Sequence, residues 1–168
     1  MNRILETARL ILRQFEPTDA KFIVTLVNSP GWLEFIGDRN IKTEEDAVNY
    51  LQGGPMKSYQ AHGFGLSMVE TKQGTPIGMC GILQRDTLEN PDIGFAFLPE
   101  FMGRGYAFEI ANATLTYAKT KLKFGTILAI TLPTNEKSIK LLEKIGLKFK
   151  QTIFTPDKNE ELMLFSTK

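Results

Sequence analysis

The stretch DIGFAFLPEFMGRGYAFE, residues 92–109, decides how this chain folds. Its first seven residues have the pattern of a β-strand, and an amphipathic helix begins at Tyr106. Between these elements Gly103 and Gly105 leave the backbone bare. The first amides of a helix lack partners and carry partial positive charge, so small residues there let an anion reach the backbone. The stretch therefore predicts a phosphate site; the alternative is a plain turn in which the glycines supply positive φ.

This loop differs from the two common phosphate motifs. No Lys-Ser/Thr pair follows it, as in a mononucleotide P-loop, and it lacks the G-x-G-x-x-G spacing of a dinucleotide site. Arg104, between the glycines, either adds charge at the mouth of the site or points to solvent. A different phosphate ligand is indicated.

The composition is that of a globular protein without a global charge bias. Of the 168 residues 42% are hydrophobic, and 20 Lys and Arg nearly balance 19 Asp and Glu. We expect one domain, residues 1–168, and no nucleic-acid or membrane partner. No apolar run approaches the roughly 20 residues of a membrane helix and no signal-peptide pattern is visible, so we expect a cytoplasmic protein. One cysteine, Cys80, and one histidine, His62, indicate neither a disulfide nor a metal site.

Outward from residues 92–109, periodicity predicts seven strands and four helices. The strands are expected at residues 9–15, 64–70, 76–84, 92–98, 126–132, 148–154 and 161–166. The helices are expected after Pro17, after a Thr43 cap, from Tyr106, and after an Asn135 cap as far as Gly146. Short connections among the three strands of residues 64–98 favour antiparallel pairing. This order predicts a mixed α/β fold, with a curved mixed central sheet of about seven strands flanked by about four helices.

Three segments of the chain resemble a known family. TARLILRQFEPTDA (residues 7–20), DIGFAFLPEFMGRGYAFE (residues 92–109) and NEKSIKLLEKIGLKF (residues 135–149) are similar to the first strand, the central acyl-CoA motif and the last-helix motif of GNAT N-acetyltransferases. The similarity is to the RimJ/RimL-like branch, which acetylates ribosomal protein N-termini. It covers nearly the whole chain in the right order, and it implies the GNAT acyl-CoA N-acyltransferase fold.

The resemblance implies acetyl-CoA as cosubstrate and no metal. The strand ending at Leu98 would pair through its backbone with the pantetheine amides, while the amides of residues 103–107 would take the pyrophosphate. Residues of the last helix would face the pantetheine and the thiol. The residues so assigned to the cofactor are Phe97, Leu98, Gly103, Arg104, Gly105, Tyr106, Ala107, Asn135 and Ser138.

Two departures from the family pattern affect the chemistry. Met102 stands where the family loop often begins with Gln or Arg, which leaves the loop amides intact. Leu142 stands where many members carry a tyrosine that protonates the leaving thiolate. Ser138 is then the best remaining donor; the alternative is a first-turn serine that closes the helix start. Backbone N–H groups near Phe97 and Leu98 are expected to stabilise the negative charge on the acetyl oxygen.

The general base and the acceptor pocket are harder to place. Asp92 is the first candidate for a base or water-holder, with Glu34 and Asp157 as alternatives, and each also fits an ordinary solvated acid. The segment PGWLEFIGDRN, from Pro30, lies where the family builds its acceptor pocket, so Trp32, Glu34 and Phe35 are candidate substrate-binding residues. Core or lid packing of the two aromatic side chains is the alternative. 

These observations lead to one main functional hypothesis. We expect an N-acetyltransferase that transfers the acetyl group of acetyl-CoA directly to a primary amine, either a protein N-terminal α-amine or a small-molecule amine. A non-catalytic acyl-CoA-binding module of the same fold is the alternative, motivated by Leu142 and by the lack of an unambiguous base. A nucleotide-binding scaffold is a third possibility. Either a monomer or a homodimer fits the sequence.

Overall fold

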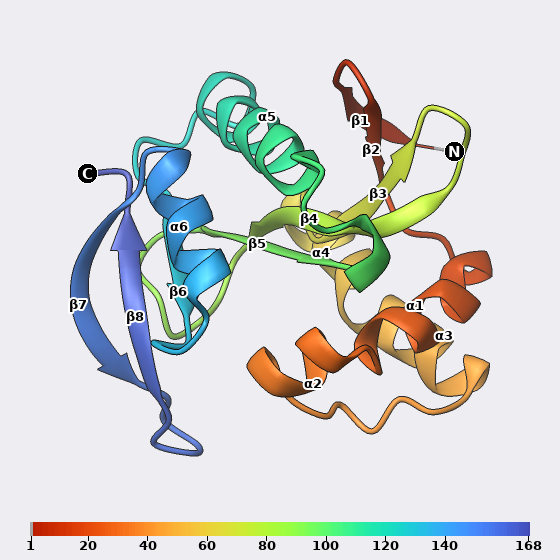
Figure 1. Ribbon diagram of the computed structural model, residues 1–168, viewed down its shortest axis with the longest axis horizontal. Coiled ribbons are helices and arrows are strands. Elements are labelled where there is room, and N and C mark those ends of the chain that lie inside the picture. The colour runs from red at the N-terminus through yellow and green to blue at the C-terminus, as the bar shows by residue number, and fades with distance from the viewer. Residues whose placement is uncertain (1) are drawn as a thin grey trace.

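The computed structural model describes residues 2–168, and these form an eight-stranded sheet with helices on both faces (Figure 1). The sheet order is β1-β2-β3-β4-β5-β6-β8-β7. The strands are β1 (Arg3–Glu6), β2 (Leu10–Arg13), β3 (Ser67–Thr71), β4 (Pro76–Leu83), β5 (Asp92–Phe97), β6 (Leu128–Thr131), β7 (Lys148–Phe154) and β8 (Glu161–Ser166). The helices are α1 (Ala20–Val27), α2 (Pro30–Phe35), α3 (Glu44–Gly53), α4 (Pro55–His62), α5 (Tyr106–Thr120) and α6 (Glu136–Lys144), with short 3-10 turns at Pro17–Asp19 and Pro99–Phe101.

The sheet separates two apolar cores. On one face α5 and α6 cover a cluster that includes Leu12, Ile82, Ile110 and Leu142. On the other face lie α1, α2 and α3 (Figure 1), and they enclose a second cluster, whose members include Phe15. Successive side chains of a strand point to opposite faces, so the apolar strands β3 and β4 contribute to both cores. The sheet therefore holds the two helical layers in fixed positions.

All neighbouring strands pair antiparallel except β5 and β6. This parallel pair meets in register only at Asp92 and Leu128. On its other side β5 pairs with β4 along its whole length, from Asp92 opposite Leu83 to Phe97 opposite Gly78. The two strands therefore part after their first contact, and one edge of β5 is left open within the sheet.

Most predicted elements are confirmed, including the β3-β4-β5 antiparallel run and the closing β7–β8 hairpin. The Thr43 side chain caps α3, the Asn135 side chain caps α6, and Gly146 follows α6 with a φ of +103°. The predicted counts are corrected: the sheet has eight strands rather than about seven, and the described residues form six α-helices rather than about four. The additional elements are β1, α2 and α4.

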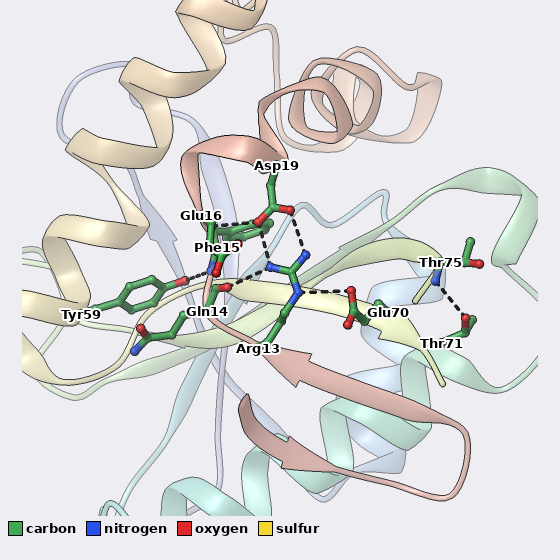
Figure 2. Close-up of polar contacts among 9 residues, drawn as sticks. All are labelled: Arg13, Gln14, Phe15, Glu16, Asp19, Tyr59, Glu70, Thr71 and Thr75. Atoms are coloured by element: carbon green, nitrogen blue, oxygen red, sulfur yellow. Dashed lines mark hydrogen bonds and ion pairs between the residues drawn. The ribbon is translucent and has the colours of Figure 1, made fainter. Parts of the chain in front are cut away.

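A buried ion cluster ties β2 and β3 to the first helical turn (Figure 2). The Arg13 guanidinium donates two hydrogen bonds of 2.9 Å to the Asp19 carboxylate and one of 3.2 Å to Glu70. The hydrogen bond to Asp19 contributes most to raising the pKa of Arg13 above its ordinary value, so this side chain stays charged. Beside the cluster, the Tyr59 hydroxyl accepts a hydrogen bond from the Phe15 N–H, which links α4 to the same corner.

The helices of residues 2–168 are all too short or too polar to cross a membrane.

Candidate active site

The gap between β5 and β6 presents backbone groups of β5. The Leu128 N–H donates to the Pro91 carbonyl at 2.9 Å, so Pro91 faces β6, whereas the Leu98 N–H donates to Ile77 at 2.9 Å and faces β4. Backbone groups alternate in direction along a strand, so residues 93, 95 and 97 face β6 like Pro91. Beyond the one contact with Leu128, the N–H and C=O groups of Phe95 and Phe97 therefore face the open gap.

A row of unpaired amides lies at the end of this gap. Gly103 and Gly105 have φ values of +78° and +80°, which is the left-handed region that glycine adopts readily. Gly105 is the N-cap of α5, and no side chain caps this helix. Within residues 2–168 the N–H groups of residues 103–107 have no hydrogen-bond acceptor. Several free N–H groups at the positive end of a helix form a site for an anion such as phosphate.

The gap between β5 and β6 and the loop with Gly103 and Gly105 belong to one cleft of about 1370 Å³. Its walls come from α2, β5, the loop after β5, β6, the start of α6 and the β7–β8 turn. Most of the residues predicted for the site line it, namely Trp32, Glu34, Phe35, Asp92, Phe97, Gly103, Gly105, Tyr106, Ala107, Asn135, Ser138 and Asp157. Residues distant in the sequence are therefore brought to one cavity.

Leu98 does not take the position expected for it. Its N–H donates to the Ile77 carbonyl at 2.9 Å and its carbonyl accepts from the Phe101 N–H at 3.1 Å. Its side chain is buried in the core, and the residue is not among those lining the cleft. The expectation that the Leu98 N–H would stabilise the acetyl oxygen is therefore wrong, because the register of β5 turns this amide toward β4.

Arg104 also lies away from the cleft lining. Its guanidinium is stacked over the Phe101 ring, with 5.6 Å between the guanidinium carbon and the ring centroid, and the residue is exposed. Its carbonyl accepts a hydrogen bond from Arg9. The Arg104 carbonyl is therefore bonded to another part of the protein, and the charge of its side chain lies at the surface, outside the cleft lining.

Asn135 and Ser138 lie at the start of α6, where the first caps the helix and the second leaves its hydroxyl unpaired. The Asn135 side-chain oxygen accepts the Ser138 N–H at 3.2 Å, so asparagine closes the helix start. The Ser138 hydroxyl has no hydrogen-bond partner among the described residues, and it is half-buried in the cleft wall. A hydroxyl in this position is available to a ligand as donor or acceptor.

Asp92 lies at the closed end of the gap, where β5 and β6 meet. Its side chain is 1% exposed, and both carboxylate oxygens lie near the Arg85 Nε, at 3.0 and 3.1 Å. Burial raises the pKa of Asp92 above its ordinary value, and the charge of Arg85 opposes that effect. The carboxylate is therefore held in one position and is shielded from bulk water.

A comparison with known proteins identifies the chain. The family model described as an acetyltransferase (GNAT) domain matches residues 9–148. The chain belongs to the GNAT acetyltransferases. It is therefore an acetyl-CoA-dependent acetyltransferase, as its resemblance to that family implied.

Relatives and solved structures agree with this assignment. The Bacillus subtilis protein YkkB is 33% identical over 155 residues, which cover 89% of this chain and 87% of YkkB. YoaA, an N-acetyltransferase of the same organism, is 31% identical over 147 residues, covering 85% of this chain and 81% of its own length. The fold matches that of RimL, a ribosomal L7/L12 α-N-protein acetyltransferase solved with coenzyme A, with a TM-score of 0.83, 14% identity, and coverage of 98% and 97% of the two chains.

The free backbone groups of the cleft fit the chemistry of acetyl-CoA, the cosubstrate of GNAT acetyltransferases. An extended pantetheine arm with two amides suits the open edge of β5, and a pyrophosphate suits the free amides of residues 103–107. A Cβ atom built on Gly103 would meet nothing within 4 Å, so space is present beside the loop. Met102 and Leu142 line the same cleft, and neither carries a group that ionises.

The wall formed by α2 carries the residues predicted for the acceptor. Trp32 is 6% exposed and packs in the second core, and its indole N–H is buried without a partner among the described residues. Glu34 is exposed at the rim and Phe35 is half-buried beside it. Trp32 thus packs against the protein, while Glu34 faces solvent at the cleft.

His62 and Cys80 lie outside the cleft. His62 is exposed at the end of α4 and stacks on Phe64, with ring centroids 5.7 Å apart. Cys80 is buried in β4, and burial raises the pKa of its thiol to about 12. Neither residue is among those lining the cleft.

Two residues near the site were missed in the sequence. Arg85, in the β4–β5 connection, holds Asp92, and Arg9, in the β1–β2 turn, contacts the glycine loop. Arg9 lies within the TARL segment that carried part of the family resemblance, but its contact with the loop joins residues 95 positions apart. Only the folded sheet brings these arginines to the site.

Proposed function

We propose that this GNAT acetyltransferase transfers the acetyl group directly to an α-amino group, within a complex that holds both substrates. One observation carries the proposal: the open edge of β5 leads from the free amides of residues 103–107 into a cleft that also contains the unpaired Ser138 hydroxyl. Acetyl-CoA, when bound, supplies the activated acetyl thioester. Glu34, exposed at the rim, would attract a cationic amine.

Backbone groups would hold and polarise the acetyl donor. The N–H groups of residues 103–107 would bind the pyrophosphate, and Asn135 would fix the start of α6 beside the pantetheine. The Phe95 and Phe97 backbones face the gap, where they would hold the pantetheine amides and the acetyl oxygen. Such preorganised N–H groups stabilise negative charge as it develops on that oxygen, because they need no reorganisation at that moment.

Proton transfer would require little from the side chains. A thiol with a pKa of about 8.5 leaves readily. The Ser138 hydroxyl would donate its proton to the departing sulfur, and the proton released by the attacking amine would replace it. An α-amine with a pKa of about 7.8 is roughly one-tenth neutral at pH 7, whereas a lysine amine is neutral in less than about one part in a thousand. The buried, ion-paired Asp92 suits a water-holding role better than that of a strong base. An acceptor that is partly neutral without a strong base is therefore favoured, which means an α-amine over a lysine or a polyamine.

The proposal is tested by ligand binding and turnover in one plate. Acetyl-CoA should raise the melting temperature, because a ligand that binds only the folded state stabilises it. Thiol release should follow with peptides bearing a free N-terminus and with amino acids. The matched control is the same peptide with a blocked N-terminus and a free lysine. Release only from lysine, polyamine or aminoglycoside would overturn the α-amine assignment, and stabilisation without any release would overturn the proposed transfer.

A further inference from the structure

Arg9 makes three contacts with the glycine loop and the start of α5. From the β1–β2 turn, its Nε donates to Glu109 Oε2 at 3.0 Å, and its Nη1 donates to the Arg104 carbonyl at 3.0 Å. Its guanidinium carbon lies 4.4 Å from the centroid of the Tyr106 ring. A Cβ atom on Gly105 would lie 3.3 Å from Arg9 Nη2, so this side chain also lies directly against the loop.

The contact with the Arg104 carbonyl bears on the amide that follows it. The Arg104 carbonyl and the Gly105 N–H belong to one planar trans peptide, so they point in opposite directions. The Arg104 carbonyl receives no hydrogen bond from α5 among the described residues; the first such bond of the helix is from the Glu109 N–H to the Gly105 carbonyl. Arg9 is therefore the group that holds this peptide, and with it the direction of the Gly105 N–H.

Because residue 105 is a glycine, the orientation of the peptide before it depends on a contact from outside the loop. Rotation of the Arg104–Gly105 peptide changes the φ of Gly105, and glycine tolerates both signs of φ with similar ease. Without an external contact the peptide would sample orientations in which its N–H points away from a bound phosphate. The Arg9 side chain is 48% exposed, and an exposed ion pair contributes little to stability. The ion pair with Glu109 alone therefore does not account for the position of Arg9 against the Arg104 carbonyl.

We infer that Arg9 is a positioning residue that orients the Gly105 amide toward the pyrophosphate of acetyl-CoA. The inference rests on the proposed function, in which residues 103–107 bind that pyrophosphate. Two donors on different edges of one planar guanidinium suit this role: Nε is fixed by Glu109 while Nη1 holds the Arg104 carbonyl. Lysine would keep the charge but would lose this geometry.

The test compares two acetyl donors, one with and one without the 3′-phospho-ADP part of coenzyme A, which includes the pyrophosphate. Acetyl-CoA contains it, whereas S-acetylpantetheine has the same thioester and arm but no phosphate. In Arg9→Met we expect the KM for acetyl-CoA to rise about tenfold with kcat nearly unchanged, while kcat/KM for S-acetylpantetheine stays at the wild-type value. Turnover of S-acetylpantetheine also reports that the variant is folded. Glu109→Gln, which loosens the other donor of Arg9, should give a smaller rise in the same direction.

Two further variants separate orientation from charge. Arg9→Lys should recover only part of the lost affinity, whereas full recovery would mean that charge alone acts. Arg3→Met, in the same hairpin and exposed, should leave both donors unaffected. Equal loss with both donors, or no loss with acetyl-CoA, would overturn the role of Arg9. A wild-type enzyme that does not distinguish the two donors would instead overturn the pyrophosphate assignment of the loop.

Discussion

At the scale of single residues, the backbone and the hydroxyl of Ser138 can be tested separately. Its N–H is capped by Asn135, while its hydroxyl is unpaired in the cleft. We predict that Ser138→Ala lowers kcat by about a hundredfold, the lower range for a general acid, because the thiol leaves readily without help. The KM for acetyl-CoA and the melting temperature should change little, since the helix cap remains. Steady-state thiol release and thermal unfolding measure both.

The matched control for Ser138→Ala is a substitution of Asn135, the residue that caps the Ser138 N–H. Asn135→Ala removes the cap and should cost about 1 kcal/mol of stability. Loss of stability in Ser138→Ala together with unchanged kcat would return the serine to a purely structural role.

Asp92 gives a prediction about pH. Burial raises its pKa above the ordinary value, so the folded state favours the protonated carboxyl. Relative to Asp92→Asn, which is neutral at every pH, the contribution of Asp92 to stability should be largest at low pH. It should be lost as pH rises through the raised pKa, over a window from about pH 4 upward.

Urea unfolding of the wild type and Asp92→Asn at several pH values measures this difference directly. A difference that grows in favour of the wild type with rising pH would show that the attraction of Arg85 outweighs burial.

At the scale of elements, the strongly periodic segments could be predicted from the sequence and the short ones could not. Helix α5 and the strands β3, β4 and β5 have patterns long enough to be unambiguous. Helix α2 has six residues including Pro30 and Gly31, so it resembles a loop in composition. Helix α4 follows two glycines and begins at Pro55, and β1 has only four residues. Tertiary packing rather than local propensity fixes these three elements.

The candidate site was predictable where it depends on local sequence. The glycine loop and the helix start at Tyr106 are local features, as is the Asn135 cap. The orientation of Leu98 was not predictable, because it depends on the register between β4 and β5. The ion pair between Arg85 and Asp92 was missed for a related reason, since nothing in the sequence indicates that the β4–β5 connection folds back onto β5.

At the scale of the whole molecule, the Arg13 cluster joins the sheet to the helical layer (Figure 2). The side chains of Arg13 and Asp19 are each 10% exposed and that of Glu70 is 8% exposed. We predict that Arg13→Met lowers the free energy of unfolding by about 3–5 kcal/mol, because two buried carboxylates lose their partner. Urea denaturation measures the change, and the exposed Arg3→Met, expected within about 0.5 kcal/mol of wild type, is its control.

A second comparison identifies the cause of that loss. Replacing Asp19 and Glu70 by apolar residues together with Arg13→Met should restore much of the stability, since no buried charge then remains unpaired. A loss below about 1 kcal/mol in the single variant would mean that water reaches the two carboxylates.

The parting of β5 from β6 also bears on how such a scaffold tolerates mutation over evolutionary time. On the proposed function, the acetyl donor is held mainly by main-chain groups, which most side-chain substitutions leave in place. On the same proposal the acceptor would lie against other parts of the cleft lining, α2 and the β7–β8 turn, neither of which pairs with β5 or β6 where these strands part. Sequence drift in those two segments can therefore alter which amine is accepted while leaving the grip on the cofactor unchanged.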